Sequence, residues 1–233
     1  MKEAIIENQK LLYTNMASRI DFRSYQFTSR IKQQFEDVSI WSSAALEWLM
    51  LEHYQFSFHN PQFLLDAAKL TMKLEEKGIS AELRRNFEEE ESHAVIYKKA
   101  LFEIGINVEK RVEFTPTSKF LDDVARLITQ SPYYTLGVMY ATETAAIFEH
   151  EVFRDMSCEL LKRRNISNPR NRLIAFHDMH LDGVEQAHKD NLGVFLNLGN
   201  ISQDSKNIYY GACNAIISMT QWWVSLLEKA KVI

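Results

Sequence analysis

The sequence of 233 residues has few cysteines and no long apolar run. Its two cysteines, Cys158 and Cys213, have neither a CxxC spacing nor the pattern of a disulfide framework, which favours a reducing compartment. No apolar run approaches the ~20 residues that cross a bilayer. Two acids in the first eight residues interrupt the apolar core that a signal peptide needs. We therefore expect a cytoplasmic protein that does not span or bind a membrane.

An excess of basic charge is also absent. The chain carries 27 Lys and Arg against 31 Asp and Glu, a formal net charge of −4. Nucleic-acid-binding domains and proteins that bind anionic membranes usually show a basic surplus. The composition therefore excludes both classes of partner, whereas the 46% apolar residues suffice for one large core.

Glycine and proline are scarce, with seven and four residues respectively, and both residues break helices. Between them the apolar residues recur at spacings of three and four, and strict alternation is missing. The pattern predicts helices near 3–18, 25–36, 41–58, 61–77, 80–105, 118–130, 132–165, 170–198 and 203–230. We expect a single all-α domain over residues 1–233.

The informative residues are acids and histidines within apolar helices. Glu52 and Glu143 each stand among bulky apolar or small residues. Two Glu-x-x-His motifs occur as well, Glu90 to His93 and Glu185 to His188, the second shortly after His180.

Residues three apart on a helix share one face, so each Glu-x-x-His motif can present an oxygen and a nitrogen to the same ion. Two such motifs with acids from two further helices are typical of a dinuclear iron or manganese site in a helical bundle. Buried carboxylates need compensating charge, which two divalent cations supply. Imidazole together with carboxylate favours Fe or Mn over a thiolate-bound zinc.

Each motif also has an ordinary structural interpretation. Runs of acids such as residues 88–91 are usually solvated, and either Glu89 or Glu90 could be the ligand. Glu143 could be a buried acid paired with an arginine or tyrosine. Glu52 is an alternative ligand or an acid that orients one. Asp178 and Asp182 are further alternatives. The remaining histidines and one more acid are interpreted as structural or surface residues: His53, His59, His150, His177 and Glu149.

Three segments resemble the haem-oxygenase-like di-iron oxidases, most closely the CADD-like proteins. They are residues 86–93 with Gly105, residues 137–143, and residues 176–188, within a similarity that spans roughly 40–200. The resemblance implies a haem-oxygenase-like bundle of seven to nine helices, two Fe (or Fe/Mn) ions without haem, and dioxygen activation on a small substrate. In the nearest relatives the implied product is p-aminobenzoate for folate synthesis. The metal ligands implied are Glu90, His93, Glu143, His180, Glu185 and His188.

The sequence departs from the family pattern in its last motif. The first position of that motif falls on Leu181, which cannot bind metal, while His180 lies beside it on the helix. We predict a π-type widening between His177 and Glu185, near Gly183, that brings His180 into line. Thr142 stands where the chlamydial member has a tyrosine, and no N-terminal tyrosine matches the one thought to be consumed there, which argues against a self-sacrificing reaction.

The predicted function is a dinuclear iron oxidase or oxygenase whose partners are a small-molecule substrate and dioxygen, with a homodimer left open. One alternative is a non-catalytic helical interaction protein with a structural metal site. Another is a metal-free small-molecule enzyme of the thiaminase (TenA/PqqC-like) type. That type needs a nucleophilic cysteine, and neither Cys158 nor Cys213 has an identifiable base beside it.

Overall fold

The computed structural model describes residues 15–168, 171–198 and 204–233, and every regular element within them is a helix. The predicted all-α fold is therefore confirmed, while parts of the predicted helices 3–18, 170–198 and 203–230 lie outside the described residues. The elements are α2 (Met16–Gln33), η1 (Val38–Ile40), α3 (Ser43–Thr71), α4 (Lys77–Glu90), α5 (His93–Glu103), η2 (Val108–Lys110), α6 (Thr115–Leu127), α7 (Pro132–Arg163), α8 (Arg172–Met179), the π-helical η3 (His180–Val184), α9 (Glu185–Leu196) and α10 (Ser205–Ala230).

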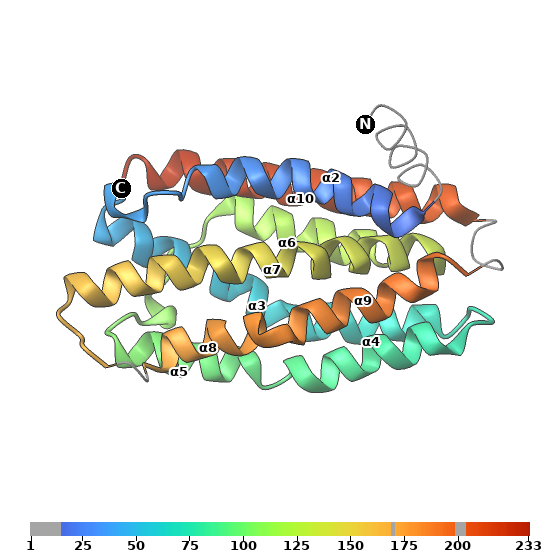
Figure 1. The fold of residues 1–233 in the computed structure, drawn as a ribbon, viewed down its shortest axis with the longest axis horizontal. Helices are drawn as coiled ribbons and strands as arrows, with labels where there is room; N and C mark the ends of the chain where they lie inside the picture. The colour runs from blue at the N-terminus through green and yellow to red at the C-terminus, as the bar shows by residue number, and fades with distance from the viewer. Residues whose placement is uncertain (1–14, 169–170, 199–203) are drawn as a thin grey trace, which may run out of the picture.

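Helix α7 is the central element of the bundle (Figure 1). It packs against α10, α3, α9, α8 and α2, so apolar residues occur all round its surface rather than on one side. Helices α2 and α10 lie together along one edge, and α4 and α5 lie along the opposite edge beside α9 and α8. None of the described helices is both long and apolar enough to cross a membrane.

Two glycines allow α7 and α10 to approach closely. A Cβ atom on Gly137 would lie 1.9 Å from the carbonyl oxygen of Ile208. One on Gly211 would lie 2.1 Å from the carbonyl oxygen of Tyr134. Any side chain at either position would push the two helices apart, so the contact depends on these glycines.

Local sequence signals account for several helix ends. The Ser42 hydroxyl caps α3 by accepting the backbone N–H of Ala45. Ser131 caps α7 in the same way, and Pro132 follows at the first helical position, where its missing N–H costs nothing. Asn171 caps α8.

Three predicted boundaries were wrong. Helix α2 is continuous where a break was expected over 19–24, and α3 continues through Pro61. The apolar surface of α3 extends beyond the proline to Phe63 and Leu64, and this packing offsets the lost backbone hydrogen bond. Conversely, the single helix predicted over 80–105 is divided into α4 and α5 at residues 91–92.

Candidate metal centre

The break between α4 and α5 places the first Glu-x-x-His motif. Glu90 is the last residue of α4 and His93 the first of α5, so the pair does not share one continuous helix as predicted. Both side chains nevertheless point into one buried pocket, with Glu90 Oε2 2.9 Å from His93 Nδ1. The two side chains of the motif therefore lie close enough to share an ion, although they flank the break between two helices.

The second motif follows a distorted turn. Residues 180–184 form the π-helical segment η3, and Gly183 has φ +104°, a conformation that glycine adopts without steric cost. The predicted widening is thus confirmed, although Gly183 leaves helical geometry and the chain is kinked there. As a result His180 Nε2 lies 3.1 Å from His93 Nδ1 and 3.8 Å from Glu185 Oε1.

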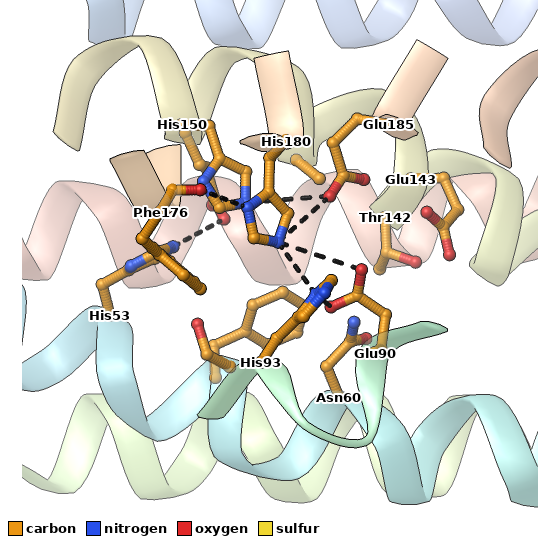
Figure 2. Close-up of a pocket in the computed structure, with 14 residues that line it drawn as sticks. His53, Asn60, Glu90, His93, Thr142, Glu143, His150, Phe176, His180 and Glu185 are labelled. Carbon is orange, nitrogen blue, oxygen red and sulfur yellow. Dashed lines mark hydrogen bonds and ion pairs between the residues drawn. The ribbon is translucent and has the colours of Figure 1, made fainter. Parts of the chain in front are cut away.

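Glu143 on α7 and the residues of α9 complete the cluster. The Nδ1 atom of His188 lies 3.4 Å from Glu143 Oε2 and 3.7 Å from Glu185 Oε2. Figure 2 shows Glu90 and His93 facing His180 and Glu185 across the pocket, with Glu143 at one side. All six residues predicted as metal ligands therefore come together, from α4, α5, α7, η3 and α9.

The spacing of these atoms suits metal ions. Glu90, His93 and His180 form one group of donor atoms that lie close enough to share an ion, and Glu90, Glu185 and His188 form another. With metal–nitrogen bonds of about 2.1 Å, neighbouring donors on one ion lie about 3 Å apart. The 2.9 and 3.1 Å separations around His93 Nδ1 match that value. Two histidines and one carboxylate are the ligand set of many non-haem iron sites.

Unpaired atoms give a second reason to place ions here. Glu90 Oε1 and His188 Nδ1 are buried and have no hydrogen-bond partner among the residues that the structure describes. Orphaned buried acceptors are costly in a folded protein unless something binds them. Glu90 and His188 both belong to the donor groups described above, so a cation would satisfy these two atoms, and the residues present fit a site for divalent metal.

The charges of the cluster are strongly coupled. Burial tends to raise the pKa of Glu90, but hydrogen bonding to His180 and His93 outweighs it and lowers the pKa to about 2. Burial and the nearby carboxylates of Glu143 and Glu90 raise the pKa of Glu185 to about 7. Burial opposes protonation of His188, yet Glu143 and Glu185 raise its pKa to about 11. Without metal, protons on His180 and His188, whose pKa values the neighbouring carboxylates raise, balance the buried carboxylates.

The structure places two further histidines in the same region, buried rather than on the surface. His150 Nε2 lies 3.7 Å from Glu185 Oε1, and the His150 ring stacks on that of His180. His150 Nδ1 is 3.1 Å from Nδ1 of the fully buried His177. Burial holds the pKa of both His150 and His177 well below the usual value, so both are neutral.

The pocket also reaches a carboxyl group on α7. Glu149 is buried rather than solvated as predicted, and its Oε1 accepts a hydrogen bond of 2.8 Å from Trp223 Nε1. Nε2 of the buried His53 lies 3.8 Å from Glu149 Oε2. One sequence signal was available for this region, because His150 follows Glu143 by seven residues and so lies on the same side of α7. His59 is only half-buried and lies outside the pocket.

The other acids that the sequence analysis named as alternative metal ligands lie outside the cluster. Glu52 is fully buried, but Arg111 donates two hydrogen bonds of 2.9 and 2.7 Å to its carboxylate, so it is neutralised without metal. Asp178 pairs with Arg154, and Asp182 is exposed. Glu89 contacts the outer nitrogen of His188 rather than the pocket, which assigns the inward position to Glu90.

The free space in the pocket is small. The cavity holds about 30 Å³, enough for a water molecule or a diatomic gas. Ser57 and Asn60 on α3 and Thr142 on α7 line it beside the charged residues. An organic substrate that contacts the metal positions therefore requires side chains to move.

Comparison with known proteins shows which solved structures share the fold of this chain. No protein-family model matches the sequence, and no curated protein is significantly similar to it. A CADD-like protein of unknown function from Nostoc punctiforme is similar in structure, with a TM-score of 0.75, 23% identity, and coverage of 91% of this chain and 98% of that one. A second crystal structure of that protein has a TM-score of 0.71 at 22% identity, covering 91% and 96%.

A domain of unknown function from Shewanella denitrificans, described as having a haem oxygenase-like fold, matches with a TM-score of 0.65 at 14% identity, covering 98% of this chain and 94% of that one. These values confirm the predicted resemblance at the level of the backbone. The chain therefore has the haem oxygenase-like fold that CADD-like proteins share.

Proposed function

We propose that this protein is a non-haem dinuclear iron (or Fe/Mn) oxidase that uses dioxygen to oxidise a small organic substrate. One observation carries the proposal: six carboxylate and imidazole side chains from five helical segments converge in a buried cluster that contains two unpaired donor atoms. The fold supports it, because a di-iron family shares this architecture. The resemblance to CADD-like proteins makes formation of p-aminobenzoate the first reaction to assay.

The chain's own residues have definable tasks in such a reaction. Bound iron would supply the reversible one-electron chemistry that dioxygen reduction requires. Glu90, His93 and His180 would hold one ion through one carboxylate and two imidazoles. Glu185 and His188 would hold the second ion together with Glu90, and Glu143, 3.4 Å from His188 Nδ1, lies beside them as a further carboxylate ligand. Burial of the cluster limits its contact with bulk water, and the free space of about 30 Å³ accommodates a molecule of the size of dioxygen.

The test is metal binding followed by oxygen uptake. Protein loaded anaerobically with Fe(II) should hold close to two ions per chain and consume dioxygen when air is admitted. Glu143→Ala should lose at least one ion, whereas Glu88→Ala, which removes an exposed acid paired only with Arg84, should retain both. A wild-type protein that stays metal-free after reconstitution contradicts the proposal.

The small cavity favours one second candidate, a structural metal site in a non-catalytic interaction protein. A structural site closes its coordination sphere, whereas a catalytic site keeps a position open. Protein that binds two Fe(II) ions but neither consumes dioxygen nor binds an exogenous anion such as azide would support this second function.

A further inference from the structure

The four consecutive acids at residues 88–91 differ in their surroundings, and Glu89 is distinctive. Its side chain is 41% exposed, yet Glu89 Oε2 lies 2.8 Å from Nε2 of His188, which is 1% exposed. The contact joins α4 to α9, which are neighbours in the bundle (Figure 1). Glu89 therefore reaches from the surface to the outer edge of a predicted metal ligand.

The two nitrogens of His188 have different partners. Nε2 donates its hydrogen to Glu89, because a carboxylate can only accept. Nδ1 points to the opposite side, towards Glu143 and Glu185, where it has no hydrogen-bond partner. With its Nε2–H held by Glu89, the ring has only Nδ1 left to offer to an ion.

Glu89 is itself fixed in place despite its exposure. Arg85, one helical turn earlier on α4, pairs with Glu89 through Nη1 and with Glu82 through Nη2. This guanidinium bridge along α4 limits the rotamers of the Glu89 side chain. The neighbouring Glu88 is exposed and, within the described part of the chain, pairs only with Arg84, at 3.5 Å.

We propose that Glu89 is a positioning residue for the metal centre: it accepts the Nε2–H of His188 and so makes Nδ1 the metal-binding atom. Carboxylates that hold metal-ligating histidines in this way orient the ring and raise its basicity. The inference rests on the proposed function. It assigns separate tasks to two adjacent acids. Glu90 would bind metal directly, whereas Glu89 would orient the His188 ring through its outer nitrogen.

The first experiment titrates the full chain with Co(II), whose visible absorption reports its ligands. Glu89→Ala should weaken binding of one of the two ions by about 10–100-fold and change the absorption of that ion alone. Glu89→Gln should restore most of the affinity, because its amide oxygen can accept the same hydrogen. Glu88→Ala is the matched control and should bind Co(II) like the wild type.

The second experiment observes the nitrogen atoms directly. Histidine ¹⁵N NMR of the Zn(II)-loaded protein should show a slowly exchanging Nε2–H on His188 and a metal-bound Nδ1. In Glu89→Ala that N–H should exchange rapidly with solvent.

Two outcomes overturn the inference. Glu89→Ala with wild-type Co(II) affinity and spectrum would leave the proposed function intact while excluding the role of Glu89. Equal weakening of both ions with no recovery in Glu89→Gln would show that the contact is merely structural. Failure of the wild type to bind Co(II) or Fe(II) is a different result, since it removes the proposed function itself.

Discussion

The carboxyl group of Glu149 lies where α3, α7 and α10 meet, with only 3% of the residue exposed. Its charged neighbours are few. Trp223 donates one hydrogen bond, the imidazole of His53 lies 3.8 Å away, and burial lowers the pKa of His53 to about 3, which leaves it neutral. Burial, reinforced by the charge of Glu185, raises the pKa of Glu149 to about 7.

This shift makes a prediction about stability and pH. The Glu149 carboxyl group ionises at the ordinary pKa of 4.5 in the unfolded chain but only near 7 in the folded protein. The free energy of unfolding therefore falls as the pH rises between these two values. The total loss is about 3 kcal/mol. Glu149→Gln should therefore be more stable than the wild type above pH 7, with the difference vanishing below pH 4.5.

Urea unfolding of the metal-free proteins between pH 4 and 8 measures the effect. Glu151→Gln, two residues along and exposed in an ion pair with Lys32, is the control and should shift stability little at any pH. A Glu149→Gln variant whose stability parallels that of the wild type across this range would show that the carboxyl group is ionised in the folded protein.

At this scale the sequence could predict which acids and histidines gather in the pocket but not their surroundings. Glu90, His93 and Glu143 were identifiable from helical spacing and from an acid among apolar residues. Glu149 was not, because its neighbours His150 and Glu151 suggest a solvated surface, and only the packing of α10 buries it. Glu52 could instead have been taken for a metal ligand, because the residue that balances its charge, Arg111, is distant in sequence.

Among the elements, η3 controls the geometry of the site. Gly183 has φ +104°, and a Cβ atom there would meet nothing within 4 Å, so only the backbone conformation opposes a larger residue. Left-handed geometry costs other residues about 1–2 kcal/mol. Relief of that strain would draw the turn towards a regular helix, in which His180 points about 140° away from Glu185.

Gly183→Ala should therefore lower stability modestly and weaken metal binding more than its stability loss explains. Ala187→Gly is the control, because it places a glycine at an exposed position of α9 at a cost of about 1 kcal/mol without altering η3. Co(II) titration and urea unfolding of both variants provide the comparison. Equal metal affinity in the two variants would show that η3 does not depend on its glycine.

Predictions of the helices and their interruptions succeeded where a local sequence pattern determined the backbone. The widening at η3 followed from a ligand pattern displaced by one residue beside a glycine. The continuity of α3 through Pro61 and the division of α4 from α5 were not predictable. The first depends on burial of residues beyond the proline. The second occurs within a run of strong helix formers, where local propensity favours one long helix.

For the whole molecule, the proposed metal binding would be linked to folding, because the donor side chains come together only in the folded bundle. An ion that binds only the folded state stabilises it by RT ln(1 + [L]/Kd), about 2.7 kcal/mol at 100-fold excess over Kd. For a chain of this size that corresponds to roughly 5–10 °C in melting temperature per ion. We expect Fe(II) or Mn(II) under anaerobic conditions to raise the melting temperature by at least this amount.

Mg(II), which prefers all-oxygen ligands, should produce a much smaller rise. Differential scanning fluorimetry with each ion at equal concentration makes the comparison. An identical melting temperature with and without Mn(II) would mean that internal proton transfer already satisfies the acids.

The overall architecture was predictable because scarcity of helix breakers and helical periodicity agree along the chain. The resemblance to CADD-like proteins added the bundle type, and the structural comparisons confirm it. Close approaches such as that of Gly137 to Ile208 could not be predicted, since they join residues far apart in sequence.

The hydrogen bond from Trp223 to Glu149 places an indole ring against the wall of the pocket. Trp223 is fully buried and also packs against Phe153 and Phe148. We expect an open-shell ion bound in this pocket to quench indole emission more strongly than a closed-shell ion such as Zn(II). The protein would therefore carry an intrinsic fluorescent probe of the proposed centre, and tryptophan emission, to which Trp223 contributes, would follow filling of that centre without a label.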